Sequence, residues 1–241
     1  MVPWKALATV TTSEGVLQLR QRGPREFLIT IDGRVLMTSE ERTSEQAVAT
    51  LACAQIRDRK PPRVLIGGLG MAYTVRAALD ALPRSAQVTV AELTAEVEVW
   101  NRGPLAPLTA SAVADPRVTV AIVDVAKLIK GAAPGAFDAI VLDLYEGPHH
   151  AAKRPNDPFY GHAALDRSFA ALSPGGVLAI WSEEENAVFK RRLADVGFET
   201  TLHRPGGSRA YVVYLGRRPD REPAASRSGT RTRNVRVRSP R

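Results

Sequence analysis

The stretch VLIGGLGM, residues 64–71, is the strongest indication of fold in this 241-residue chain. Its first half is a short apolar run typical of a buried strand. Its second half places Gly67, Gly68 and Gly70 at a turn before a helical pattern. Glycines let the backbone turn sharply and approach a ligand without Cβ atoms in the way. The helix that follows offers free N–H groups at its start. The stretch therefore predicts a strand–turn–helix unit that can hold a ligand.

An acidic residue follows this turn at the distance used by nucleotide-binding units. Glu92 ends the next apolar run, 22 residues after Gly70. A carboxylate at this place can accept hydrogen bonds from both hydroxyls of a ribose. The NAD form of the pattern has a third glycine near the position of Tyr73, so the sequence counts against a nicotinamide cofactor and favours an adenosine-type ligand. The alternative is that the glycines only form a tight turn.

Strands alternate with helices from Arg63 onward, which predicts a parallel sheet with right-handed crossovers. The expected strands are 64–67, 87–92, 118–123, 137–143 and 176–181, and the expected helices are 72–82, 95–101, 125–130, 163–172 and 184–196. Two more strands, 198–203 and 209–215, follow with only a turn between them, which predicts an antiparallel hairpin at the end of the sheet. We therefore predict an α/β fold for residues 43–216, a Rossmann-like, doubly wound sheet of seven mostly parallel strands.

A small β segment, residues 1–42, precedes this domain. Short runs with β-branched residues predict strands at 7–12, 16–21, 26–31 and 34–38. Asp32 and Gly33 join the last two strands, and Asp-Gly is typical of a type I′ hairpin turn because both positions need a positive φ. A helical pattern over 43–57 follows and ends before two prolines.

Most of the positive charge lies in the C-terminal tail. Residues 217–241 hold nine arginines and two acids, so they carry +7 of the net charge of +8. A segment this rich in Arg, Ser and Pro, with no aromatic residue, cannot bury enough apolar surface to fold, so we predict disorder. The tail could make weak, nonspecific contacts with nucleic-acid phosphates, or it could serve solubility alone.

Composition excludes several other classes of protein. The single cysteine, Cys53, excludes an intramolecular disulfide and a four-cysteine zinc site. No apolar run approaches the roughly 18 residues needed to cross a bilayer, and residues 1–12 lack the pattern of a secretion signal. We therefore expect a cytoplasmic protein without a membrane segment.

Two further acids stand where predicted strands end. Asp124 comes directly after the strand 118–123, and Asp143 ends the strand 137–143. Ligands of open α/β sheets bind at the carboxyl ends of the strands. A carboxylate at Asp124 can accept a hydrogen bond from an adenine amino group, or it can cap the helix that follows.

Asp143 and Glu146 form a pair of carboxylates three residues apart at the mouth of the same pocket. Such a pair can hold a cationic acceptor, or take a proton from an ammonium group so that the nitrogen lone pair attacks. The alternatives are a structural cap for Asp143 and simple solvent exposure for Glu146. The loop 144–158 is long enough to close over a substrate. The histidines in and near it match no metal-ligand spacing, so we predict no metal site.

In this order, the glycine turn, Glu92, Asp124 and Asp143 resemble the spermidine synthase-like proteins. These are polyamine aminopropyltransferases with the class I S-adenosylmethionine-dependent methyltransferase fold. Three further motifs extend the resemblance: IDGRV at 31–35, DPRV at 115–118 and LSPGGVL at 172–178. The resemblance implies that Glu92 binds ribose, that Asp124 binds adenine and that Asp143 activates the attacking amine. It also implies S-adenosylmethionine or its decarboxylated form as donor substrate, no tightly bound cofactor, a small amine acceptor and a homodimer.

The chain departs from this family on the polyamine side of the site. Polyamine synthases usually carry an aspartate in the glycine loop, where it helps to bind the amine end of the donor, and residues 67–71 contain none. They usually read Asp-Ser-x-Asp-Pro after the fourth strand, where this chain reads DLYEGP at 143–148, so Glu146 only approximates the second aspartate. Ser44 or a neighbour replaces a usual tyrosine. The nucleoside half of the site is thus intact and the polyamine half altered.

Three functions are compatible with these residues. The first is transfer of an aminopropyl group from decarboxylated S-adenosylmethionine to a polyamine or similar amine. The second is an S-adenosylmethionine-dependent methyltransferase with an unknown acceptor, which the missing loop aspartate favours. The third is a non-catalytic protein that binds a nucleoside. Modification of RNA would combine a transferase with the basic tail.

Overall fold

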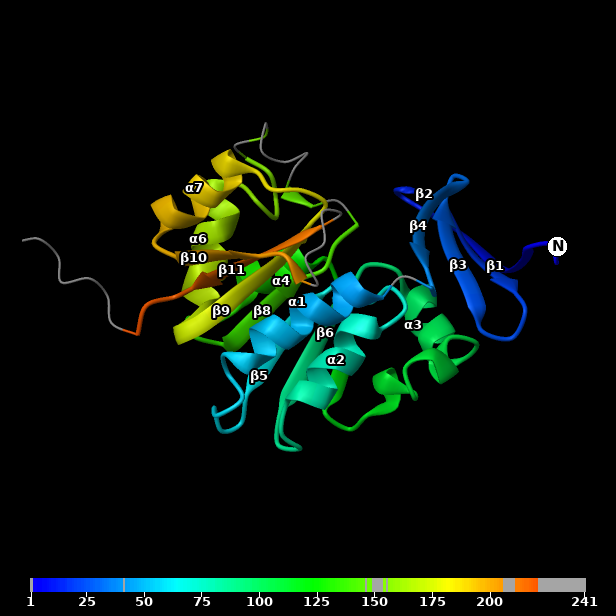
Figure 1. The fold of residues 1–241 in the computed structure, drawn as a ribbon, viewed down its shortest axis with the longest axis horizontal. Helices are drawn as coiled ribbons and strands as arrows, with labels where there is room; N and C mark the ends of the chain where they lie inside the picture. The colour runs from blue at the N-terminus through cyan, green and yellow to red at the C-terminus, as the bar shows by residue number, and fades with distance from the viewer. Residues whose placement is uncertain are drawn as a thin grey trace, which may run out of the picture.

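The structure, a computed structural model, describes residues 2–40, 42–145, 147–148, 154, 156–205 and 211–220. The chain forms a four-stranded sheet near its N-terminus and a seven-stranded sheet with helices on both faces (Figure 1). The α/β class predicted from the sequence is confirmed. Within the described residues, no helix is both long enough and apolar enough to cross a membrane.

The N-terminal sheet is a meander of antiparallel strands. Its strands are β1 (Lys5–Thr12), β2 (Gly15–Arg22), β3 (Glu26–Ile31) and β4 (Arg34–Thr38), in that spatial order. The turn between β3 and β4 has φ values of 47° at Asp32 and 78° at Gly33, as a type I′ turn requires. Asp32 also ties this turn to β2, because its Oδ1 accepts a hydrogen bond from the N–H of Val16 at 2.8 Å. The predicted hairpin is therefore confirmed.

The large sheet is doubly wound. Its strands are β5 (Arg63–Gly67), β6 (Gln87–Glu92), β7 (Val118–Ile122), β8 (Phe137–Leu142), β9 (Leu172–Ser182), β10 (Glu199–His203) and β11 (Val212–Arg217). Their spatial order is β10-β11-β9-β8-β5-β6-β7. Only β11 runs antiparallel to its neighbours, which confirms the predicted hairpin at the end of the sheet. The direction of winding reverses between β5 and β8, so the carboxyl ends of these two strands border the crevice where such sheets bind ligands.

Helices cover both faces of this sheet. One face carries α1 (Thr43–Ala54), α2 (Tyr73–Ala81) and α3 (Ala95–Arg102), and the other carries α4 (Val125–Gly131), α6 (His162–Ala171) and α7 (Ala187–Val196). Two short 3₁₀ turns, Ala106–Leu108 and Ala112–Ala114, lie between α3 and β7. Figure 1 shows α1 and α2 side by side across the front of the sheet.

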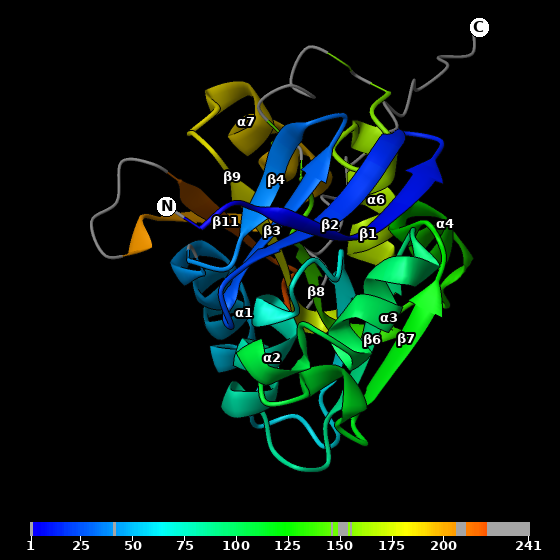
Figure 2. The same ribbon diagram turned by 90° about the vertical axis from the view of Figure 1, so that its right-hand side faces the viewer.

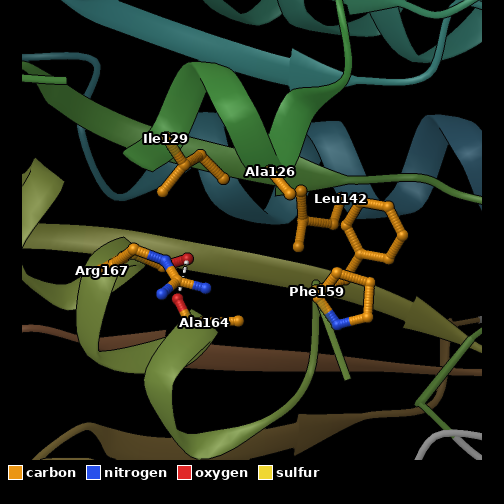
Figure 3. A pocket seen from close by; sticks show the side chains of 8 residues that line it. Ala126, Ile129, Leu142, Phe159, Ala164 and Arg167 are labelled. Atoms are coloured by element: carbon orange, nitrogen blue, oxygen red, sulfur yellow. Dashed lines mark hydrogen bonds between the residues drawn. The ribbon is translucent and has the colours of Figure 1, made fainter. Parts of the chain in front are cut away.

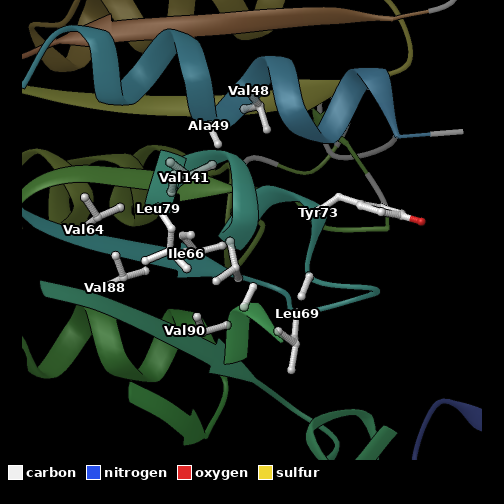
Figure 4. Close-up of a cluster of buried hydrophobic side chains, with 14 of the residues drawn as sticks. Val48, Ala49, Val64, Ile66, Leu69, Tyr73, Leu79, Val88, Val90 and Val141 are labelled. Carbon is white, nitrogen blue, oxygen red and sulfur yellow. The ribbon is translucent and has the colours of Figure 1, made fainter. Parts of the chain in front are cut away.

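The core has two apolar layers because side chains alternate along the buried strands. Val64 and Ile66 of β5 point toward α1 and α2, whereas Leu65 between them points to the opposite layer. Val141 of β8 joins the first layer, which Figure 4 shows packed beneath Val48 of α1. All five side chains are at most 1% exposed, as expected for strands covered on both faces.

Several predicted boundaries were wrong by a few residues. The helix predicted from 184 begins at Ala187 because the Asn186 side chain caps it, accepting the N–H of Phe189 at 3.0 Å. The helix predicted over 43–57 ends at Ala54. The strand predicted from 176 begins at Leu172, and its pairing with β8 shifts between Leu172 and Val177, which leaves residues 173–176 as a bulge.

The C-terminal strand extends past the predicted limit of the domain. Arg217 still pairs with β9 and β10. Arg218 then holds the β9 bulge: its N–H donates to the carbonyl of Gly176 at 2.8 Å, and its carbonyl accepts from Gly175 at 2.9 Å. The rest of the tail predicted to be disordered, residues 221–241, lies outside the described residues.

The N-terminal sheet lies against the carboxyl edge of the parallel sheet (Figure 2). The hydroxyl of Tyr73 donates to the carbonyl of Ser39, just after β4, at 3.0 Å. The guanidinium of Arg34 in β4 lies 5.2 Å from the ring centroid of Tyr145, which follows β8. These contacts bring β4 next to the first turn of α2 and the loop after β8, so the N-terminal sheet borders the predicted crevice.

A buried carboxylate joins three strands at the opposite edge. Asp138 is 4% exposed. Its Oδ2 accepts the backbone N–H of Arg63 at 2.9 Å, and its Oδ1 accepts the hydroxyl of Ser173 at 2.7 Å. Burial alone would raise the pKa of Asp138, but the hydrogen bonds from Arg63 and Ser173 hold it below its ordinary 3.8. The ionised carboxylate therefore stabilises the fold at neutral pH.

Replacing Asp138 with asparagine is expected to lower the free energy of unfolding at pH 7 by about 1–3 kcal/mol, because an amide NH₂ would face the donors of Arg63. A lowered pKa stabilises the fold above the ordinary value of 3.8 and ceases to do so as the pH falls through the folded pKa. The difference from wild type should therefore shrink below about pH 4 in urea unfolding experiments. Asp80→Asn is the control, because Asp80 is 66% exposed in its ion pair and should cost under about 0.5 kcal/mol. An equal loss at pH 7 and pH 3 would contradict this role.

Candidate active site

The glycine loop leaves β5 at the crevice and passes under the end of β8. Gly68 has a φ of +89°, which disfavours any residue with a side chain. A Cβ atom at Gly68 would lie 2.6 Å from the carbonyl oxygen of Asp143. The N–H of Gly68 donates to Ala91 in β6 at 2.9 Å, and the N–H of Asp143 donates to Gly67 at 3.1 Å. The loop thus joins the ends of three neighbouring strands by backbone contacts that only glycine permits.

Glu92 supports this loop from the end of β6. Its side chain is 9% exposed, and its Oε2 accepts the N–H of Leu69 at 3.0 Å. Its Oε1 accepts the N–H of Thr94 at 2.8 Å. Burial raises the pKa of Glu92, and the backbone N–H groups of Thr94 and Leu69 oppose that rise. The backbone N–H of Leu93 also acts on this carboxylate, and a lone pair that these donors leave can accept a hydroxyl group of a ligand at the loop.

Asp124 stands at the end of the next strand, β7. Its Oδ1 accepts the N–H of Ala126 at 2.8 Å, so this residue is the N-cap of α4. The capping role that the sequence left open is therefore present. Oδ2 accepts no hydrogen bond in the described part of the chain, and the side chain is half-buried. Capping thus leaves one carboxylate oxygen for a polar group of a ligand.

A small apolar cavity lies behind this edge, between α4 and α6 (Figure 3). Ala126 and Ile129 of α4 face Phe159 and Arg167 across it, and Leu142 of β8 closes one end. Its volume is about 10 Å³, enough for roughly one water molecule. A nucleobase does not fit into this cavity in this conformation.

Asp143 follows β8 beside the glycine loop. The hydroxyl of Thr74, in the first turn of α2, donates a hydrogen bond to its Oδ2. The pKa of the Asp143 carboxyl is raised to about 7: burial raises it most, the hydrogen bond from Thr74 lowers it, and repulsion from Glu45 contributes to the rise. A carboxyl with this pKa is a competent general base near neutral pH, because it can bind and release a proton there.

Three residues of this site were not predicted from the sequence. Thr74 is 3% exposed and reaches Asp143 from α2, and Glu45 lies in the first turn of α1. Asn101 of α3 is 2% exposed, and its Nδ2 donates to the carbonyl of Gly70 at 2.8 Å. The sequence could have indicated Thr74, because a polar residue early in the helix after a glycine loop faces the crevice. No sequence pattern indicates Asn101, since only the packing of α3 brings it to the loop.

The structure brings some of the predicted site residues together. Backbone hydrogen bonds join the glycine loop to Asp143 and to the strand that ends in Glu92. Asp124 stands one strand farther along the same edge, and within the described residues its side chain hydrogen-bonds to Ala126 and not to the loop. The predicted second carboxylate, Glu146, lies outside the described residues, as do His149 and His150. In the described ranges, no three His, Cys, Asp or Glu side chains gather as a metal site.

Comparisons with known proteins give two kinds of likeness. No protein-family model matches the chain. Putrescine N-methyltransferases 3 and 1 of Nicotiana tabacum are each 32% identical to it over 123 residues, which is 51% of this chain and 30% and 31% of theirs. The chain thus spans about a third of the length of the curated relatives it matches.

Solved structures match over most of the chain. Spermidine synthase from Thermotoga maritima superposes with a TM-score of 0.70 and 18% identity, over 90% of this chain and 74% of that one. A spermidine synthase bound to the transition-state analogue AdoDATO gives 0.69 with 18% identity, over 90% and 73%. A probable spermidine synthase from Corynebacterium glutamicum gives 0.60 with 22% identity, over 92% and 83%. This chain therefore has the spermidine synthase fold, a Rossmann-like methyltransferase fold with a small N-terminal sheet, as its motifs predict.

Proposed function

We propose that this chain is a transferase that moves an aminopropyl group from decarboxylated S-adenosylmethionine to a polyamine or a similar small amine. The observation that carries the proposal is the Asp143 carboxyl, whose pKa is raised to about 7 by burial, directly beside the glycine loop. The same loop is held from its other side by Glu92. A base and a nucleoside-binding carboxylate thus share one short segment of backbone.

The proposed chemistry is an in-line displacement at the carbon bonded to the sulfonium sulfur. Asp143 takes a proton from the ammonium group of the acceptor, and the freed nitrogen lone pair forms the new C–N bond. The C–S bond breaks, its electron pair stays on sulfur, and a neutral thioether nucleoside leaves. Glu92 and Asp124 hold the ribose and the adenine, and the sequence assigns Glu146 an assisting role. Holding donor and acceptor in line supplies much of the rate.

Methyl transfer from intact S-adenosylmethionine is the second candidate, and one observation favours it. The loop offers no carboxylate to the amine end of an aminopropyl donor. Met71, at the end of the loop, is uncharged and fully buried in the apolar layer beneath α1 and α2. The likeness to putrescine N-methyltransferases over 51% of the chain agrees with this alternative. Both candidates use the same base and the same nucleoside half of the site.

Calorimetric titration with each donor separates the candidates. Tighter binding of decarboxylated S-adenosylmethionine than of the intact form would support aminopropyl transfer, and the reverse order would support methyl transfer. Asp143→Asn is the control for the acceptor side, because it should leave donor affinity unchanged. Binding without turnover on any amine would leave a nucleoside-binding protein, and binding of neither donor would overturn the proposal. The homodimer and the cytoplasmic location remain predictions.

The basic tail is proposed to make weak contacts with nucleic-acid phosphates. The chain leaves the described fold at Asp220, beside Arg217 and Arg59. Removing residues 221–241, which hold seven of the arginines, should lower RNA affinity at 50 mM salt about tenfold and flatten its salt dependence. Fluorescence anisotropy with a labelled single-stranded RNA measures both. Unchanged affinity at low salt would exclude the tail from RNA contact.

A further inference from the structure

Asp143 is approached from two helices that the proposed mechanism does not use. Thr74 lies in the first turn of α2 and is almost fully buried, and its hydroxyl points at Oδ2 of Asp143. Glu45 lies in the first turn of α1, which packs beside α2. The hydroxyl of Ser44 donates to Oε2 of Glu45 at 2.7 Å and steadies the half-buried carboxylate.

A hydrogen bond joins the first turn of α2 to the segment that precedes α1. Tyr73, the neighbour of Thr74, donates to Ser39 at 3.0 Å, and Ser39 lies just before α1. Glu45, in the first turn of α1, is close enough to Asp143 for its negative charge to raise the pKa of that carboxyl.

We propose that Thr74 and Glu45 control Asp143 from opposite directions: the Thr74 hydroxyl aims and stabilises its carboxylate, and the Glu45 carboxylate supplies the second negative charge for a cationic amine acceptor. This inference rests on the proposed function. The inference places the second negative charge of the acceptor site at Glu45 in α1, whereas the sequence predicts it at Glu146. Thr74 is a positioning residue here, because it acts through Asp143, and Glu45 is an acceptor-binding residue.

The charges around Asp143 agree with this division. Among the described residues, Glu45 is the charged side chain that acts on Asp143, and its repulsion raises the pKa of that carboxyl. Burial raises the pKa of Tyr73, the neighbour of Thr74; Arg42 lowers that pKa, and Glu45 raises it. Thr74 acts on Asp143 in the sense opposite to Glu45, because its hydrogen bond favours the ionised form.

Substitutions of Thr74 and Glu45 should therefore shift the acidic limb of the pH profile of kcat/KM in opposite directions. Thr74→Val removes the hydrogen bond to the ionised form, so the limb should move to higher pH by about one unit. Thr74→Ser keeps a hydroxyl and should restore the wild-type profile. Glu45→Gln removes the repulsion, so the limb should move to lower pH, while the KM for an aliphatic diamine rises roughly fivefold. The KM for a monoamine of equal length should change less.

Glu40→Gln is the matched control for charge, because Glu40 is exposed and lies outside the site. The titration of Asp143 itself, followed by ¹³C NMR of the carboxyl carbon in the ligand-free protein, gives a readout that needs no turnover. Asp143→Asn assigns the signal. Calorimetry of the diamine against wild type and Glu45→Gln gives the acceptor affinity in the same way.

The outcomes separate this inference from the proposed function. Opposite shifts of the Asp143 titration, with weaker diamine binding in Glu45→Gln, would support the inference even if no transfer were detected. Absence of transfer with either donor would overturn the proposed function alone. Unchanged titration in both variants, or diamine binding unaffected by Glu45→Gln, would overturn the inference even in an active enzyme.

Discussion

Replacing Asp143 with asparagine is expected to slow transfer by about 10²–10⁴-fold while donor affinity stays within about twofold. An amide has nearly the same shape as the carboxyl but cannot accept the proton of the acceptor ammonium group. Wild-type kcat/KM should rise with pH through about 7, where the Asp143 carboxyl ionises, and the variant should lose that limb. Initial rates across pH 5.5–8.5, with donor affinity measured by calorimetry, check both statements.

A measurement of stability distinguishes the loss of the catalytic base in Asp143→Asn from a loss of the fold. A carboxyl whose pKa is raised binds more protons in the folded than in the unfolded state between pH 3.8 and about 7. Its ionisation therefore destabilises the fold as the pH rises through that window. The asparagine variant escapes this cost, so it should be at least as stable as wild type at pH 8. Asp166→Asn, at an exposed position of α6, is the control for both measurements. Full activity in Asp143→Asn would remove Asp143 from the mechanism.

Replacing Glu92 with alanine is expected to weaken donor binding by about 100-fold or more, because two interactions are lost together. The ribose hydroxyls lose their acceptor, and the N–H groups of Leu69 and Thr94 lose theirs. An unsatisfied buried donor costs about 1–3 kcal/mol, so the variant should also unfold at lower urea concentration. Donor calorimetry and urea unfolding measure the two effects separately.

Two matched variants sharpen this test. Glu96→Ala removes an exposed carboxylate four residues farther along the chain and should change neither quantity. Glu92→Gln keeps one oxygen acceptor for the loop, so it should retain more stability than Glu92→Ala while still binding donor poorly. Donor affinity unchanged in Glu92→Ala would mean that this carboxylate only holds the loop.

Local sequence was sufficient for most of the elements. Apolar alternation and the Asp-Gly turn give the N-terminal meander, and β6 begins and ends where its pattern does, at Gln87 and Glu92. One boundary was wrong because a distant part of the chain contributes hydrogen bonds. The β9 strand begins early because Arg218 hydrogen-bonds to its bulge from the far end of the chain. No local pattern near residue 172 contains that information.

The candidate site also has a part that local sequence indicates and a part that depends on packing. The sequence alone determined the glycine loop, Glu92, Asp124 and Asp143 as candidates, because strand ends in a parallel sheet follow from periodicity and meet at one edge. The surroundings of Asp143, in contrast, depend on how the helices pack. Thr74 and Glu45 are 69 and 98 residues before it in the chain, and the packing of α1 beside α2 brings them to one carboxyl. The pKa of Asp143 depends on the water and charge around it, and these are properties of the packed chain rather than of any segment.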